Sequence, residues 1–341
     1  MQMRDDLGIT TKLENGKAYL EFALPEKIGR LLSALQIEIW EGAEGERLVF
    51  HGEYSSEEAD SMTALLLRPH LWDGMRDPYV YLVKAQGRFR SVEYGEKMGG
   101  MEKEEKLDSA EDITGEVEMY WRQELTIYDV RVVEKKGILL NEKEFLPHEV
   151  VYRLPPQISD AGMRVEQVRR DLERLARMGV NAIRLEGTGS GAERQNCYEV
   201  RAFYRLCRRG GFLTGDLWIR PENLPVYRGL PGETTCQALL AADGRTLTER
   251  YYYYQAKWSS EPVLYPVLST LHRQENGLLS LTIYSNQKKV VLYVDGLLFL
   301  FQTATSGDPE FIFEDIPVEK LPLHLAVEAG NLSISLTVTK L

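Results

Sequence analysis

The chain changes its hydrophobic period twice, and these changes constrain its fold more than any other feature of the sequence. Between residues 8 and 131, apolar and polar residues alternate in short segments such as 18–23 and 35–40. Period-two alternation with Gly and Asn between the segments is typical of an antiparallel β-sandwich. The alternation returns between residues 263 and 341. The two ends of the chain therefore predict two sandwiches, separated by a region of different period.

The central region has the pattern of helices alternating with buried strands. Residues 165–178 place apolar side chains at three- and four-residue spacing and are followed by Gly179, which indicates a helix with a C-terminal glycine stop. Residues 180–185 and 211–218 have the composition of strands, and 198–209 that of a second helix. Such alternation predicts parallel βα units. About three units are predicted, whereas a closed barrel needs eight strands and typically ~250 residues.

Four segments carry a resemblance to a known family. Residues 70–81, HLWDGMRDPYVY, lie in the first predicted sandwich, and 171–184, DLERLARMGVNAIR, and 203–207, FYRLC, lie in the central region. They closely resemble motifs of glycoside hydrolase family 2, the β-galactosidase and β-glucuronidase group, where the last two appear as DLxxLKxMGxNAIR and FYxLCD. Residues 281–296 resemble a hairpin of that family's C-terminal immunoglobulin-like domain.

The resemblance implies a multidomain, mainly β protein with an α/β part. We expect an immunoglobulin-like β-sandwich over residues 1–131, with an exposed insertion near 95–115 that is rich in Glu, Lys and Gly. A truncated TIM-barrel-like βα segment with a Pro-rich connector is expected over 132–240. A C-terminal immunoglobulin-like β-sandwich is expected over 241–341.

The family's catalytic carboxylates have no counterpart in this sequence. Retaining glycosidases act through two carboxylates ~5–5.5 Å apart, one as acid and one as nucleophile. In the family both are glutamates on later barrel strands, the acid in an Asn-Glu pair. The only Asn-Glu pair here, Asn141-Glu142, lies in a predicted hairpin before the first βα unit. The resemblance therefore implies a degenerate, noncatalytic family 2-like protein with a carbohydrate-related binding or scaffold role.

Two alternatives give the chain an active site or a protein partner. Glu186 and Asp216 both follow predicted parallel strands, at the ends where such folds place their sites. A recruited pair of these carboxylates would make an active glycosidase, whereas pairing with nearby Arg184 or Arg220 would make them structural. Arg184, Glu186, Asp216 and Trp218 are the candidate ligand-binding residues. In the other alternative, the chain is an interaction module for a full-length glycosidase.

Four consecutive tyrosines, residues 251–254, precede the second sandwich. On a strand, alternate rings would point to opposite faces. They would then either fill a seam between domains or stack on sugar rings, because a tyrosine ring is suited to both. We expect them to fill a seam.

The charge balance argues against polyanionic partners. The chain has 41 Lys and Arg against 52 Asp and Glu, a net charge of −11, which disfavours nucleic acid and anionic membranes. No segment reaches the ~18 apolar residues needed to cross a bilayer, and the first residues lack a signal-peptide pattern, so we expect a cytoplasmic protein. The cysteines and histidines lack metal-ligand spacing, so neither a metal nor a cofactor is expected.

An incomplete barrel leaves strand edges and apolar faces uncovered. The sandwiches, the connector or a second copy of the chain must then cover them. Covering by a second copy predicts a homodimer through the open βα segment. Carbohydrate is the other expected partner.

Overall fold

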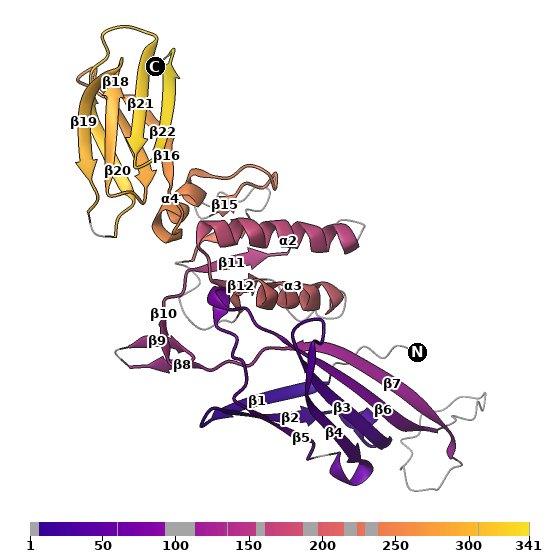
Figure 1. Ribbon diagram of the computed structural model, residues 1–341. Helices are drawn as coiled ribbons and strands as arrows, with labels where there is room; N and C mark the ends of the chain where they lie inside the picture. Colours follow the sequence, from indigo (N-terminus) through magenta and orange to yellow (C-terminus); the bar gives the residue numbers. More distant parts are fainter. Residues whose placement is uncertain are drawn as a thin grey trace, which may run out of the picture. The chain divides into compact units, whose positions relative to one another are not determined.

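The computed structural model describes residues 7–59, 61–92, 113–134, 136–154, 161–186, 197–214, 224–228, 238–305 and 307–340. The chain divides into two units, Met1–Phe145 and Leu146–Leu341, and Figure 1 colours them along the sequence. The insertion expected near 95–115 lies almost entirely outside the described residues, which resume at Ile113.

The first unit contains an antiparallel sandwich. One sheet has the strand order β1–β2–β5, and the other has the order β4–β3–β6–β7. Neighbouring strands are antiparallel throughout. The elements are β1 (Gly8–Glu14), β2 (Lys17–Ala23), α1 (Glu26–Gly29), β3 (Leu32–Glu41), β4 (Arg47–Ser55), η1 (Ser56–Glu58), β5 (Thr63–Leu67), η2 (Gly74–Arg76), β6 (Tyr81–Val92) and β7 (Ile113–Leu125).

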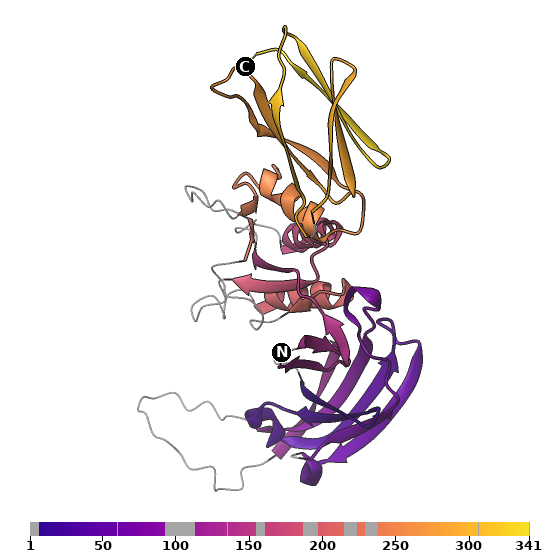
Figure 2. The same cartoon turned by 90° about the vertical axis from the view of Figure 1, so that its left-hand side faces the viewer.

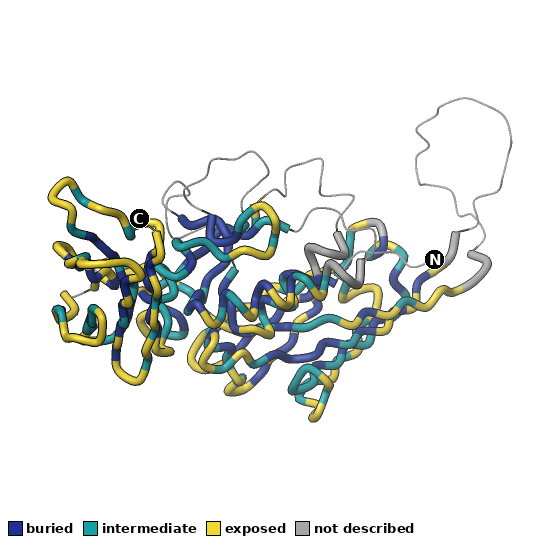
Figure 3. The backbone as a smooth tube through the Cα atoms, turned by 90° about the horizontal axis from the view of Figure 1, so that it is seen from above, coloured by how far each residue is buried: buried dark blue, intermediate teal, exposed yellow. Residues whose placement is uncertain are grey.

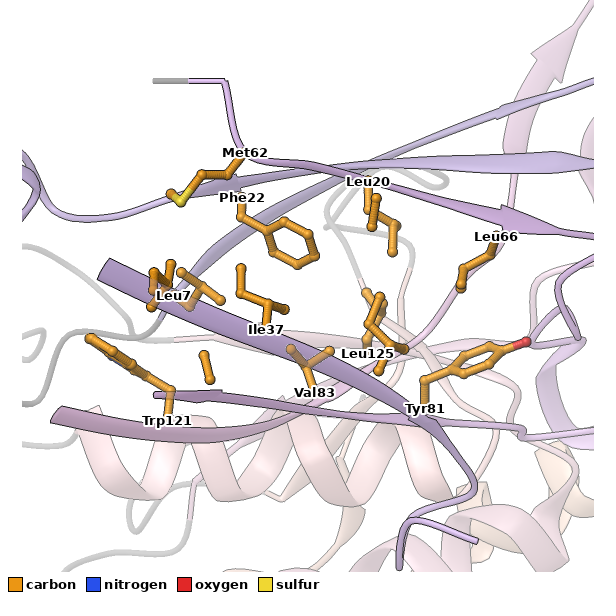
Figure 4. Packing of buried hydrophobic residues seen from close by; sticks show 14 of the residues in the cluster. Leu7, Leu20, Phe22, Ile37, Met62, Leu66, Tyr81, Val83, Trp121 and Leu125 are labelled. Carbon is orange, nitrogen blue, oxygen red and sulfur yellow. The ribbon is translucent and has the colours of Figure 1, made fainter. Parts of the chain in front are cut away.

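The core of this sandwich follows from the alternation along its strands. In β2, Ala18, Leu20 and Phe22 are buried while the residues between them are exposed. Leu20 and Phe22 point toward Ile37 of β3 and Val83 of β6, which belong to the other sheet (Figure 4). The predicted sandwich alternation is confirmed here, because one face of each strand lies inside.

The loop formed by residues 70–81 has a structural role. Trp72 is 1% exposed, and its backbone N–H donates to the carbonyl of Ile127 at 2.9 Å. The His70 ring stacks on the Tyr79 ring with their centroids 3.8 Å apart. These contacts hold the loop between β5 and β6 in one conformation.

A small antiparallel sheet of order β10–β9–β8 completes the first unit. The side-chain amide of Asn141 donates to the carbonyl of Trp72 at 2.9 Å, and the Lys143 ammonium lies 2.9 Å from Asp73. These contacts tie the small sheet to the 70–81 loop. The expected boundary at residue 131 therefore falls within a strand of the first unit. The strands are β8 (Val130–Val133), β9 (Gly137–Leu140) and β10 (Lys143–Phe145).

A parallel sheet of order β13–β12–β11–β14–β15 lies at the centre of the second unit. The first strand, β11, pairs with β12 on one side and β14 on the other. The prediction of about three strands was wrong, since β14 lies within the segment interpreted as a Pro-rich connector and β15 follows it. Both are too short to show a period. The strands are β11 (Glu149–Arg153), β12 (Ala182–Glu186), β13 (Leu213–Thr214), β14 (Val226–Arg228) and β15 (Ala238–Leu240).

Two helices, α2 (Ala161–Met178) and α3 (Cys197–Arg209), lie side by side against one face of this sheet (Figures 1 and 2). Of the predicted apolar face of α2, Val165 is only partly buried, but the other four residues are at most 5% exposed, which confirms the face. These residues are Val168, Leu172, Leu175 and Met178. None of the helices in the described part of the chain is long and apolar enough to cross a membrane.

The four consecutive tyrosines lie in helix α4 (Glu249–Trp258), so the strand interpretation was wrong. Helical geometry turns successive rings by about 100°, so they reach different neighbours. The rings nevertheless fill a seam, because α4 packs against the first strands of the C-terminal sandwich. The ring contacts are Tyr252 with Tyr265 at 3.8 Å and Tyr253 with Tyr284 at 5.4 Å between centroids.

The C-terminal sandwich repeats the strand order of the first one. Its sheets are β16–β17–β20 and β19–β18–β21–β22, and buried and exposed positions alternate along the chain (Figure 3). The sequence prediction of a second sandwich is confirmed. The strands are β16 (Leu264–Arg273), β17 (Leu279–Ser285), β18 (Lys289–Val294), β19 (Leu297–Thr303), β20 (Glu310–Ile316), β21 (Leu323–Ala329) and β22 (Leu332–Val338).

Candidate functional site

The candidate site lies on the face of the parallel sheet that is turned away from α2 and α3. Val150 and Tyr152 of β11 point into the core shared with the helices. Alternate residues of a strand point to opposite faces, so the other residues of β11 lie on the candidate face. The register pairs on that face are Glu149 with Ala182, Val151 with Arg184, and Arg153 with Glu186.

Two ion pairs cross between β11 and β12 on this face. The Arg184 guanidinium donates from Nε to Glu149 Oε1 at 3.0 Å, and both side chains are largely buried, with 11% and 1% exposure. The Arg153 guanidinium donates from Nε to Glu186 Oε2, where the glutamate side chain is 48% exposed. Each carboxylate is therefore held by an arginine of the neighbouring strand.

The two glutamates of this face lie well apart along the strands. Glu149 is opposite Ala182, four residues before Glu186, so the backbone separation is roughly 13 Å at ~3.3 Å per residue. Retaining enzymes need ~5–5.5 Å between carboxylates and inverting enzymes ~6.5–9.5 Å. Each carboxylate accepts from an arginine of the neighbouring strand, Glu149 from Arg184 and Glu186 from Arg153.

The structure brings only part of the predicted site together. Arg184 and Glu186 lie two residues apart on β12, but each contacts a different partner on β11. Asp216, Trp218 and Arg220 lie outside the described residues. The proposed pairing of Glu186 with Asp216 thus stays a prediction.

A buried carboxylate, Asp171 of α2, is the centre of a hydrogen-bond network on the other face. It is 0% exposed. Its donors come from α2 itself, from β11 and from β14, so the network joins the helix to two neighbouring strands. Such bonds offset the cost of burying a charge. The donors are Tyr152 at 2.8 Å, Tyr227 at 2.9 Å, Gln167 at 2.8 Å and Arg228 at 3.2 Å.

Asp171 is not among the site residues predicted from the sequence, although the sequence contains a signal for it. This residue follows Val168 by three positions and precedes Leu175 by four, which places it on the apolar face of the helix. A carboxylate on such a face requires buried partners. Tyr227 and Arg228 could not be recognised as those partners, because β14 was not predicted.

The Asp171 network makes the free energy of unfolding of the second unit decrease at alkaline pH. Burial, followed by the nearby Asp171 charge, raises the pKa of Tyr152 and of Tyr227 well above the ordinary value of 10.0. The folded state thus favours neutral phenols. Their contribution is complete below about pH 10 and is lost as the pH rises through the higher pKa values of the folded state.

We therefore expect the free energy of unfolding of the second unit to fall as the pH rises above about 10, by up to ~1.4 kcal/mol per pH unit for each tyrosine. Denaturant unfolding of the full chain, monitored by hydrogen exchange of the β11 and β12 amides, measures this decrease. The double variant Tyr152→Phe/Tyr227→Phe should show a flatter pH profile. If the free energy of unfolding falls with pH equally steeply in the wild type and the double variant, the two tyrosines are not the cause of the pH dependence.

Among the residues that the structure describes, no group of three or more His, Cys, Asp or Glu side chains is placed to hold a metal ion. Cys207 is a buried free thiol of α3. Burial raises the pKa of the Cys207 thiol well above its ordinary value. A neutral, buried thiol is a poor nucleophile, so Cys207 is a core residue.

Solved structures of glycosidases match nearly the whole chain. An FMN-binding β-glucuronidase from Facaelibacterium prausnitzii L2-6 matches with a TM-score of 0.64 at 14% identity, over 98% of this chain and 73% of that chain. A β-glucuronidase from Parabacteroides merdae matches with a TM-score of 0.62 at 10% identity, over 98% and 63%. A glycosyl hydrolase family 2 member from Bacteroides cellulosilyticus DSM 14838 matches with a TM-score of 0.59 at 12% identity, over 98% and 63%.

These similarities show a shared fold. The chain spans less than two thirds of the length of the last two structures, at 63% each. No protein-family model matches the sequence, and no curated protein sequence matches it. The predicted likeness to family 2 glycosidases is thus confirmed at the level of the fold, and function has to be argued from the residues of the site.

Proposed function

We propose that this protein is a noncatalytic relative of family 2 glycosidases, with immunoglobulin-like sandwiches on both sides of a shortened barrel, and that it binds carbohydrate or acts as a scaffold. The pairing of β14 with β11 carries this proposal. In a closed barrel the first strand pairs with the second and the last, so β14 has the place beside β11 that the last strand has there, and β15 pairs with the other side of β14. Only residues 215–225, eleven in number, link β13 to β14.

Eleven residues are too few for further βα units, each of which takes about 30 residues. The resemblance to the family implies that catalytic glutamates would lie on strands between β13 and the last strand of a complete barrel. This chain has no length for those strands. The short link therefore supports a protein without the family's acid and nucleophile.

The ion pairs support the same proposal. Of the two predicted carboxylates, Glu186 lies within the described residues and Asp216 does not. The Arg153 guanidinium donates to one oxygen of Glu186. A carboxylate held in this way is oriented toward a strand neighbour and not toward a sugar. Glu149, the other carboxylate of that face, is buried beside Arg184.

Hydrolysis assays test the proposal. We expect the purified full chain to release no chromophore from chromogenic galactosides, glucuronides and glucosides above the background of buffer. Any turnover by the wild type would overturn the noncatalytic proposal. Loss of that turnover in Glu186→Gln or Asp216→Asn, but not in the exposed control Glu144→Gln, would then assign it to the recruited carboxylate pair.

Melting temperatures measured with the same sugars, as free monosaccharides, distinguish a carbohydrate-binding role from a scaffold role. A ligand that binds only the folded state raises the melting temperature. A shift with one sugar supports a carbohydrate-binding role, and Arg184→Ala should reduce that shift if the candidate face holds the sugar. The absence of a shift with every sugar supports a scaffold role.

A further inference from the structure

The C-terminal sandwich has one strongly apolar edge. Strand β19, with the sequence LLFLFQT, pairs with β18 on one side and lies at the edge of its sheet (Figure 1). Its apolar side chains are widely exposed. An edge strand also presents unpaired backbone N–H and C=O groups, which favour pairing with another strand. The exposed fractions are 75% for Leu297, 60% for Leu298, 43% for Leu300 and 51% for Phe301.

The first sandwich provides an internal comparison. Its strand β4 has the same place in the same strand order as β19. However, β4 carries Arg47, His51 and Glu53, whereas β19 contains no charged residue and no proline. Charged residues and prolines are the usual protection of a solvent-exposed edge. The edge at β4 has this protection and the edge at β19 does not, which indicates that β19 is covered in the working protein.

The apolar surface continues onto the second sheet. Gln302 at the end of β19 donates from its side-chain amide to the carbonyl of Ile312 in β20 at 2.6 Å. Ile312 is 51% exposed. The uncovered surface therefore includes the edges of both sheets, and a partner that extends the β19 sheet would also cover Ile312.

Charges at the two ends of β19 favour one partner. Lys289 of β18 is opposite Thr303, the last residue of β19. Asp295 lies in the turn just before β19 begins. The end of the strand is thus positive and the start is negative. Antiparallel pairing of two such strands puts the start of one beside the end of the other, so opposite charges come together.

We propose that β19 pairs antiparallel with β19 of a second copy of this chain, across a two-fold axis. The two four-stranded sheets then form one continuous sheet, and each copy contributes the same surface, as in an isologous dimer. An uncharged strand suits this arrangement, since self-pairing sets no like charges directly opposite each other. The proposal is independent of whether the protein binds carbohydrate, and it locates the second copy away from the parallel sheet.

Sedimentation velocity of the full chain from about 1 to 100 µM tests the proposal, a range suited to a small interface. We expect the wild type to form a dimer as the concentration rises. Leu300→Lys should weaken dimerisation by at least about tenfold, because it sets two ammonium groups close together across the axis. The matched control Leu268→Lys changes a residue that is 55% exposed on β16, the outer strand of the other sheet, and should dimerise as the wild type does.

A single cysteine checks the geometry without adding charge. In Leu300→Cys, mild oxidation should link two copies covalently through β19, and in Leu268→Cys it should not. A wild type that stays monomeric at every concentration would overturn the proposal. A dimer that persists in Leu300→Lys and fails to cross-link in Leu300→Cys would also overturn it, and would locate the interface elsewhere, such as the edge of the parallel sheet.

Discussion

Asp171→Ala is expected to lower the free energy of unfolding of the second unit by about 3–5 kcal/mol, the usual cost of breaking a buried charged pair from one side. The substitution leaves the Arg228 guanidinium, whose side chain is 11% exposed, without its carboxylate. It also removes the acceptor of the Tyr152 and Tyr227 hydroxyl groups. Denaturant unfolding followed by hydrogen exchange of β11, β12 and α2 measures the loss.

Glu173→Ala is the matched control for this prediction. Glu173 lies on the same helix but is exposed, and such surface substitutions usually change stability by less than about 0.5 kcal/mol. If Asp171→Ala does not fold, Tyr227→Phe tests the same network with a smaller expected loss of about 1 kcal/mol. A loss in Asp171→Ala no greater than in Glu173→Ala would show that the network does not stabilise the unit.

Gly179→Ala is expected to lower the free energy of unfolding by roughly 2–5 kcal/mol, the sum of two separate costs. Gly179 ends α2 with a φ of +90°, a backbone conformation that costs an L-residue ~1–2 kcal/mol. An added Cβ would also lie 2.5 Å from the carbonyl carbon of Trp258 and 2.9 Å from the backbone nitrogen of Ser259. Relieving such crowding typically costs ~1–3 kcal/mol, because backbone has to shift.

Gly277→Ala separates the two costs. Gly277 has a φ of +85°, and its added Cβ would meet no atom within 4 Å. We therefore expect this control to lose only the conformational cost of ~1–2 kcal/mol. Equal losses in both variants, measured by the same denaturant titration of the full chain, would mean that the close approach of α4 to Gly179 does not constrain the protein.

Predictions made from local patterns agreed with the structure where the pattern was long. The apolar spacing of 165–178 extends over several turns, and the structure contains α2 with that face buried. The glycine stop was predicted from the same pattern, and the backbone N–H of Gly179 closes the last turn on the carbonyl of Ala176 at 2.9 Å. Long alternating segments of both sandwiches were recognised for the same reason.

Predictions failed where the sequence contains no period. Four adjacent tyrosines are apolar at every position, so neither helical nor strand spacing can be distinguished in that run. Strands β14 and β15 have three residues each, which is less than two repeats of the strand pattern. The pairing of β14 with β11 joins Val226 to Val151, which are far apart in the chain, so no local pattern predicts it.

The candidate site shows the same division. Glu186 and Arg184 were identified from their place at the end of a predicted strand. Their partners, Arg153 and Glu149, come from β11 and depend on the parallel register. Asp171 was not predicted as a site residue, because its role depends on partners that are distant in the chain. Tyr227 and Arg228 of β14 donate to it only in the folded structure.

Local patterns were enough to predict the two alternating regions, the amphipathic helix with its glycine stop and the likeness to family 2 glycosidases. These depend on contacts between residues close in the chain or on motifs readable in one segment. Tertiary contacts alone specify which strand lies beside β11 on the side away from β12, which arginine holds each carboxylate and which edge lacks cover. Those features depend on contacts between segments that are distant in the chain. Such contacts are stabilised by the packed core as a whole and not by any one segment.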